Sequence, residues 1–148
     1  MNHCRLIYRS TCTDKFMANE ELRDLVEKSA ENNRKLSVTG LLVLSGDQFL
    51  QVLEGPVAAV NDLYAHIVQD SRHHHPRLIS YEPTEEIYFD DWGMSIVDLY
   101  DLPKAVREIL IRKYSSKEDA VEFPERLHEV YAFLLDAKII CQGRPWEG

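Results

Sequence analysis

The sequence predicts an α+β fold of the ferredoxin-like type, with two helices packed on one face of a five-stranded sheet and a helical extension at the C-terminus. Two observations lead to it. Short segments with apolar residues at every second position alternate with segments whose apolar residues recur every three or four positions. Along the 148 residues they give the order β-α-β-β-α-β-β, which begins with the split βαβ motif.

The first strand is expected at residues 4–10, with Tyr8 on the same face as the apolar residues at alternate positions. A helix follows, because Asn19 can cap its N-terminus and an apolar stripe then recurs at helical spacing. That stripe ends in two polar residues, Ser29 and Asn33. We therefore expect the end of the first helix to present polar side chains to the sheet.

A hairpin is expected next. Strands at 37–44 and 48–53 are separated by Ser-Gly-Asp at 45–47, which suits a short turn. Pro56 then begins the second helix, since proline is tolerated at the first helical position, and its apolar stripe continues to about Asp70.

Two further strands and two further helices complete the pattern, at residues 77–83, at 92–99, from Pro103 onward and at 124–140. No linker or internal repeat divides the chain. We expect a domain at residues 1–99, with 100–148 as an extension that serves docking or oligomerisation and is not an independent domain.

A polar residue, Gln51, interrupts the buried run of the third predicted strand. In the split motif the first and third strands are adjacent at the sheet centre, so Tyr8 is its candidate partner. Asn33 reaches the same layer from the first helix, although an asparagine there could instead simply end that helix. Uncharged polar side chains in a two-layer core predict a polar, planar, uncharged ligand edge.

Several motifs together resemble the BLUF family of blue-light sensors that bind FAD. They are "RLIY" with Tyr8, "NN" at 32–33 before "SVTGLL", "FLQVLEG" with Gln51, "DSRHH" at 70–74 and "DWGM" with Trp92 and Met94. The resemblance covers roughly residues 3–99. The whole length, including "KYS" at 113–115, is similar to the short stand-alone members of the PixD type.

The resemblance implies a flavin ring between the two helices, with Leu25 and Ile67 packing on its faces. Asn33 would hydrogen-bond the carbonyl and NH edge of the ring, with Asn32 and Ser29 close by.

Arg72 and His73 match the basic pair of the family at the end of the second helix, near the ribityl-phosphate side. His66 stands where some relatives have arginine. FMN and riboflavin therefore remain possible beside FAD.

For the photochemistry, the resemblance implies that excited flavin takes an electron and a proton from Tyr8 and that both return. A rearranged or tautomerised Gln51 remains, and its new hydrogen bonds red-shift the flavin absorption until the dark state recovers. An amide suits this role because it has a donor and an acceptor end. Trp92 and Met94 would report the state of Gln51 to the last strand and the C-terminal helices; either could be the inward one.

Composition excludes other classes. A net charge of −8 and a pI near 5.2 argue against nucleic-acid binding, which needs clustered Lys and Arg. No apolar run is long enough for a membrane segment, and three cysteines without metal-ligand spacing fit the reducing cytoplasm. We expect no metal, because adjacent histidines at 73–75 do not face one direction. Glu54 faces away from Gln51, and we expect it to be solvated or to cap a helix.

Two other functions stay open: a small hydrolase of the acylphosphatase kind and a ligand-free adaptor of the same fold. The hydrolase is disfavoured because the segment after the first strand, "STCTDKFMANEE", lacks the glycine and arginine of an anion-binding loop. Residues beyond 99 leave no room for most catalytic domains, so we expect no enzyme. The expected partners are a flavin and an unidentified downstream regulatory protein, with a homo-oligomer implied by the PixD resemblance.

Overall fold

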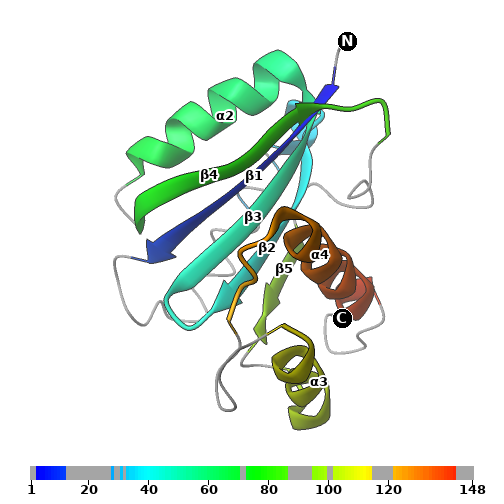
Figure 1. The fold of residues 1–148 in the computed structure, drawn as a ribbon. Coiled ribbons are helices and arrows are strands. Elements are labelled where there is room, and N and C mark those ends of the chain that lie inside the picture. Colours follow the sequence, from blue (N-terminus) through cyan, green and yellow to red (C-terminus); the bar gives the residue numbers. More distant parts are fainter. Residues whose placement is uncertain are drawn as a thin grey trace.

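The computed structural model describes residues 3–12, 28, 31, 33–70, 73–86, 95–99, 102–114 and 122–142. Five strands form one sheet in the order β4-β1-β3-β2-β5 (Figure 1). The strands are β1 (His3–Cys12), β2 (Thr39–Ser45), β3 (Gln48–Pro56), β4 (His73–Pro83) and β5 (Ser95–Asp98). The helices are α2 (Val57–Gln69), α3 (Lys104–Tyr114) and α4 (Leu127–Gln142).

The strand pairing is that of the ferredoxin-like split motif. β1 lies antiparallel between β3 and β4, and the hairpin partner β2 lies antiparallel to β3 on the other side. β5 is added parallel to β2, so the sheet is mixed. The predicted α+β fold is confirmed. Of the first predicted helix the structure describes a few residues near its end, and residues 33–35 are helical.

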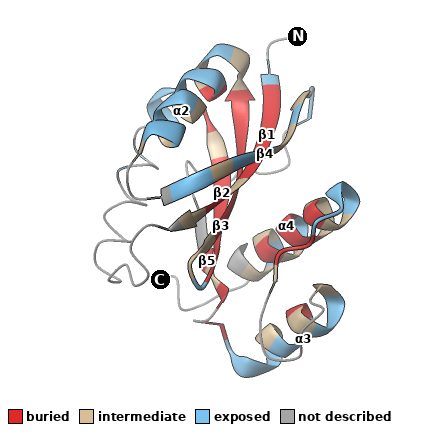
Figure 2. Cartoon of the chain, turned by 60° about the vertical axis from the view of Figure 1, so that its left-hand side comes forward, coloured by how far each residue is buried: buried red, intermediate tan, exposed pale blue. Residues whose placement is uncertain are grey.

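The three central strands β1, β3 and β2 are buried on both faces, and each face has its own apolar cluster, whereas the edge strand β4 is exposed or half-buried (Figure 2). We call the two sides the α2 face and the α4 face. The α2 face carries the cluster Cys4, Leu6, Tyr8, Val38, Leu42, Leu44, Phe49, Leu53 and Val60. Alternation along the strands places the intervening residues on the α4 face, where Ile7, Leu41, Val43, Leu50 and Val52 are buried.

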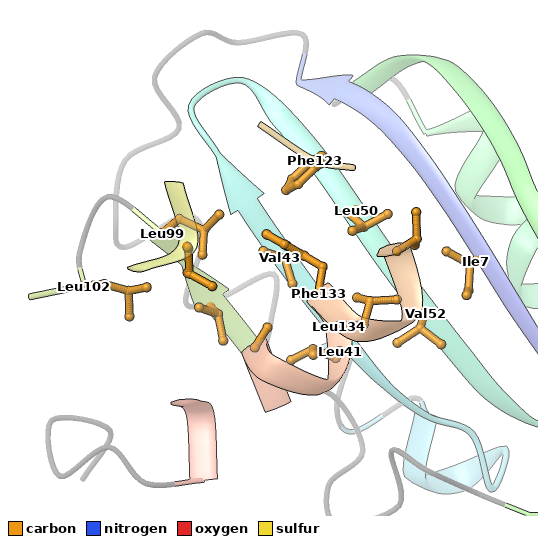
Figure 3. Close-up of a cluster of buried hydrophobic side chains, with 14 residues drawn as sticks. Ile7, Leu41, Val43, Leu50, Val52, Leu99, Leu102, Phe123, Phe133 and Leu134 are labelled. Carbon is orange, nitrogen blue, oxygen red and sulfur yellow. The ribbon is translucent and has the colours of Figure 1, made fainter. Parts of the chain in front are cut away.

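Helix α4 covers the second of these faces. Phe133 and Leu134 lie over Val43, Leu50 and Val52, as Figure 3 shows. Helix α3 adds Leu110 to the same cluster and is tied to α4 by side chains. Lys113 Nζ and the Tyr114 hydroxyl of α3 both donate hydrogen bonds to Asp136 Oδ2 of α4, at 2.8 Å and 2.5 Å. The C-terminal helices and the sheet thus share one apolar core.

A charged pair is buried on the α4 face. Arg5 Nε donates to Glu54 Oε2 at 2.8 Å, and Glu54 is 0% exposed. The expectation of a solvated or helix-capping Glu54 is therefore wrong. The two residues are direct partners in the β1–β3 register, so pairing of the strands brings the two charges together and offsets the cost of burying each alone.

Strand β4 begins earlier than expected. Helix α2 ends at Gln69, and the next residue, Asp70, is already extended (φ −73°, ψ 125°). His73 then opens β4, so its expected position at the end of the second helix is wrong. The cause is pairing with the far end of β1, where Cys12 lies opposite His73 and Thr11 opposite His74. Long-range pairing overrides the weak local signal of three histidines.

The fifth strand is predicted at 92–99, and within the described residues it spans Ser95–Asp98. Trp92 and Met94, the two predicted reporters, lie outside the residues that the structure describes.

Candidate functional site

Tyr8 and Gln51 face each other across the two central strands. They are direct partners in the β1–β3 register, and both point to the α2 face. The Tyr8 hydroxyl donates a hydrogen bond to Gln51 Oε1. Tyr8 is 3% exposed and Gln51 5% exposed, so water does not compete for this bond. Because Oε1 is engaged by the phenol, the NH₂ end of the amide is left to other partners.

The environment of Tyr8 keeps its phenol protonated. Burial raises the pKa of Tyr8 far above its usual range, and nearby Tyr64 and Asp70 raise it further. Tyr64 comes from α2, and its ring centroid lies 5.4 Å from that of Tyr8 at an interplanar angle of 53°. Tyr8 is therefore a neutral phenol that keeps its proton at ordinary pH.

Asn33 lies at the end of the first helix and is 1% exposed. It does not itself end the helix. Ser37 does, with φ 59° in the left-handed region. The Val38 N–H donates to the Asn33 carbonyl at 2.8 Å and the Ser37 N–H to the Arg34 carbonyl at 3.2 Å, which is the Schellman arrangement. The alternative role of Asn33 as a helix stop is wrong.

Helix α2 supplies the opposite wall. Leu63, Tyr64 and Ile67 are partly buried and pack against the cluster on the α2 face. Ile67 thus faces the layer that contains Tyr8, as expected for a residue that would contact a ring there.

Other predicted site residues are not described by the structure: Leu25, Ser29, Asn32, Arg72, Trp92 and Met94. For His73 the structure describes the backbone at the start of β4, but not the side chain. The structure therefore brings Tyr8, Gln51 and Ile67 together on the α2 face, and it buries Asn33 at the end of the first helix.

One polar residue of this layer was missed by the sequence reasoning. Ser10 is 2% exposed and lies two positions after Tyr8, hence on the same face of β1. Its hydroxyl belongs to the same row as the Tyr8 phenol. The alternation that singles out Tyr8 places Ser10 on the same face but does not show that its hydroxyl lacks a partner in the described part of the protein.

Comparison with known families decides what this layer is for. A sequence profile described as "Sensors of blue-light using FAD", abbreviated BLUF, matches residues 4–95, more than half of the chain. The chain belongs to the BLUF family. Its BLUF domain is a flavin-binding sensor of blue light and not an enzyme, and the matches give no support to the acylphosphatase-like hydrolase.

Individual relatives agree. The "Blue light- and temperature-regulated antirepressor BluF" of Escherichia coli (strain K12) is 35% identical over 96 residues, which are 64% of this chain and 23% of that protein. The "Photoactivated adenylate cyclase subunit alpha" of Euglena gracilis is 30% identical over 118 residues, 76% of this chain and 12% of that one. The chain thus spans less than a quarter of the length of these curated relatives.

Among solved structures, BlrB, a BLUF protein in its dark state, superimposes with a TM-score of 0.72 at 27% identity, covering 95% of this chain and 97% of BlrB. Its coverage shows that the likeness extends beyond the BLUF domain to the C-terminal helices.

The residues present suit a flavin. A flavin ring has wide apolar faces and a polar edge of carbonyl and N–H groups. The α2 face offers apolar side chains together with the phenol of Tyr8, the amide of Gln51 and the buried hydroxyl of Ser10. No cluster of three or more ligating side chains that could hold a metal occurs among the described residues. In the described part of the chain, no helix is both long and apolar enough to cross a membrane.

Proposed function

We propose that this BLUF domain binds FAD and that Tyr8 and Gln51 together record the absorption of blue light. The observation that carries the proposal is the buried hydrogen bond from the Tyr8 hydroxyl to Gln51 Oε1, at the centre of the sheet and on the face that fits a flavin. Asn33 and Ile67 would hold the ring, together with Leu25, Ser29 and Asn32, and Trp92 and Met94 would carry the change onward.

When bound and excited by blue light, a flavin supplies an oxidant able to take an electron from a phenol. Tyr8 is suited to lose that electron because it is buried and kept neutral in the dark. An oxidised phenol is a strong acid, so its proton would leave as well, along its hydrogen bond to Gln51 Oε1, which would accept it. When the electron and the proton have returned to Tyr8, Gln51 is left in a second hydrogen-bonded arrangement.

Gln51 can hold two states because its amide offers an acceptor at one end and donors at the other. In the present arrangement Oε1 accepts from Tyr8. In a turned amide the NH₂ end would face the phenol, and in a tautomerised amide the protonated Oε1 would face it; in either case the Tyr8 oxygen would accept instead. Each arrangement keeps a hydrogen bond between Gln51 and Tyr8, so light would shift the population between two hydrogen-bonded states.

FAD is the proposed flavin because the matching family is defined by it. FMN is the alternative, since the solved structure of Klebsiella pneumoniae BlrP1 contains FMN. That structure is 34% identical, with a TM-score of 0.64 over 73% of this chain and 29% of its own. His66 does not favour a phosphate contact here, because its Nδ1 lies 2.8 Å from the Asp62 carbonyl in its own helix. Arg72 and His73 are the residues proposed to contact the ribityl-phosphate side of the flavin.

The output is proposed to be altered binding of a downstream regulatory protein, with self-assembly into a homo-oligomer, in the cytoplasm. The curated relatives are an antirepressor and adenylate cyclase subunits, which are light-regulated proteins with outputs of their own. In this chain, residues 100–148 are proposed as the part that passes the change on. Helices α3 and α4 support this, because they share a core with β2 and β5.

The test is a spectrum of the purified full chain before and after blue light. The proposal predicts bound flavin and a small red shift that reverses in the dark. Release of the flavin by heat and its separation by chromatography distinguish FAD from FMN. A colourless protein that cannot be reconstituted with either flavin would instead support the ligand-free adaptor.

A further inference from the structure

We propose that the Ser10 hydroxyl is a further flavin contact, which binds the polar edge of the cofactor from β1 beside Tyr8. The inference rests on the proposed flavin site. Its starting observation is that two buried side-chain oxygens in the described part of the chain have no hydrogen-bond partner, Ser10 Oγ and Thr39 Oγ1. A buried polar group without a partner costs about 1–3 kcal/mol, so such groups are rare unless a ligand or water satisfies them.

The two hydroxyls differ in where they lie. Ser10 pairs with Phe49 in the β1–β3 register and belongs to the α2 face, the face of Tyr8 and Gln51. Thr39 pairs with Glu54 and belongs to the opposite face, next to the Arg5–Glu54 pair. A flavin on the α2 face can therefore satisfy Ser10 and cannot reach Thr39.

The backbone around Ser10 is shaped as at a binding site. The β1–β4 pairing shifts register twice, between Ile7 and Tyr8 and again between Arg9 and Thr11. At the second shift, two residues of β4, His75 and Pro76, lie opposite the single β1 residue Ser10. His75 has φ 54°, in the left-handed region. Such bulges re-aim side chains and are common next to functional sites. The segment from Tyr8 to Ser10 is thus bracketed by two irregularities of the sheet.

The chemistry of the hydroxyl fits the carbonyl and N–H edge of a flavin, because a serine can both donate and accept. The neighbours of Ser10 on the α2 face include Phe49 and Tyr8, and the phenol of Tyr8 is already used by Gln51. A bound cofactor would therefore supply the hydrogen-bond partner that Ser10 lacks among the described residues. Removing the hydroxyl should therefore affect the two forms of the protein differently. It should not destabilise the flavin-free form, in which the hydroxyl has no partner within the part of the chain that the structure describes, and it should weaken flavin binding.

The experiment compares Ser10→Ala with Thr39→Val in the full chain. For Ser10→Ala the dissociation constant of FAD, measured by quenching of flavin fluorescence, should rise about five- to tenfold, as for one lost hydrogen bond. The dark absorption maximum and the carbonyl stretches of the bound flavin in the infrared should also shift. The urea midpoint of the flavin-free protein should stay the same or rise. Thr39→Val should leave the affinity and the flavin spectra unchanged.

The outcomes separate the two proposals. If the wild type binds flavin and shows the reversible red shift, but Ser10→Ala keeps the wild-type affinity and carbonyl stretches, Ser10 does not contact the cofactor and only this inference fails. If the wild type is colourless and cannot be reconstituted, the proposed function fails first. A lowered urea midpoint in flavin-free Ser10→Ala with unchanged affinity would assign Ser10 a purely structural role.

Discussion

Arg5 and Glu54 form a buried ion pair three positions along the same two strands from the Tyr8–Gln51 pair, on the opposite face of the sheet. Arg5 also reaches Glu82 of β4 at 3.2 Å, and its guanidinium lies 5.6 Å from the ring centroid of Tyr131 in α4. The Tyr131 hydroxyl donates to Glu82. One polar network thus joins three strands of the sheet to the C-terminal helix.

Replacing Arg5 with alanine should destabilise the protein strongly. The buried Glu54 carboxylate would lose the opposite charge of Arg5, which costs about 3–5 kcal/mol, whereas replacing both residues with apolar ones of similar size should recover most of the loss. Urea unfolding of Arg5→Ala and of Arg5→Met with Glu54→Leu measures this. Lys35→Ala, which removes an exposed pair with Glu31, is the control and should change the free energy of unfolding by no more than about 1 kcal/mol. Equal effects of Arg5→Ala and Lys35→Ala would mean that burial of the pair is unimportant.

Phe133→Ala tests whether the C-terminal extension is part of the same folding unit. Phe133 is fully buried between α4 and the sheet, so its truncation should cost about 3–5 kcal/mol, with a single unfolding transition. Ile139, on the same helix but 65% exposed, is the control, and Ile139→Ala should stay within about 0.5 kcal/mol. Circular dichroism and flavin release should report the same midpoint. Two separate transitions would instead make residues 100–148 an independent unit.

The stability of the protein should fall at high pH through Tyr8. The pKa of Tyr8 is raised in the folded state, whereas in the unfolded chain it is about 10. The stability contributed by the neutral phenol is therefore fully present below about pH 10 and is lost as the pH rises toward the folded-state pKa. Other tyrosines also titrate in this range, so the comparison is with Tyr8→Phe, whose free energy of unfolding should decline less steeply above pH 10. Parallel curves for the two proteins would show that burial does not perturb Tyr8.

Asn33→Ala should weaken flavin binding about tenfold, through lost hydrogen bonds to the edge of the ring. Ser37→Gly is the matched change at the helix end. It removes the strain of a left-handed serine, so it should stabilise the protein by about 1 kcal/mol and leave the flavin affinity unchanged. Flavin titration and urea unfolding of both variants separate the two roles. Asn33→Ala with normal affinity but lower stability would make Asn33 a structural residue.

The pairing at the centre of the site could be predicted because two simple rules suffice for it. Side chains in a strand alternate between faces, and the split motif places the first and third strands side by side. Together these rules put Tyr8 opposite Gln51, and the structure confirms it. The burial of Asn33 followed from the helical period, although its distinction from a helix stop required the backbone angles of Ser37. Its contact with a flavin stays a prediction.

Features set by distant parts of the chain could not be predicted in this way. The same register places Arg5 opposite Glu54, but the burial of this pair depends on α4, which covers that face of the sheet from the far end of the chain. The start of β4 depends on how far β1 extends, because His73–His75 carry no alternation of their own. Ser10 lies in a visible pattern, but a buried serine is recognisable as unusual only when its lack of a partner is known.

The most direct test of the central proposal is the light-minus-dark absorption spectrum of two single variants, Gln51→Leu and Tyr8→Phe, beside the wild type. Leucine keeps the size of the glutamine side chain but has no donor or acceptor, and phenylalanine keeps the ring of tyrosine but has no proton to give. Both variants should bind flavin and give no reversible red shift, whereas the wild type gives one. A wild-type shift in Gln51→Leu would contradict the role of Gln51 as the element that stores the light signal.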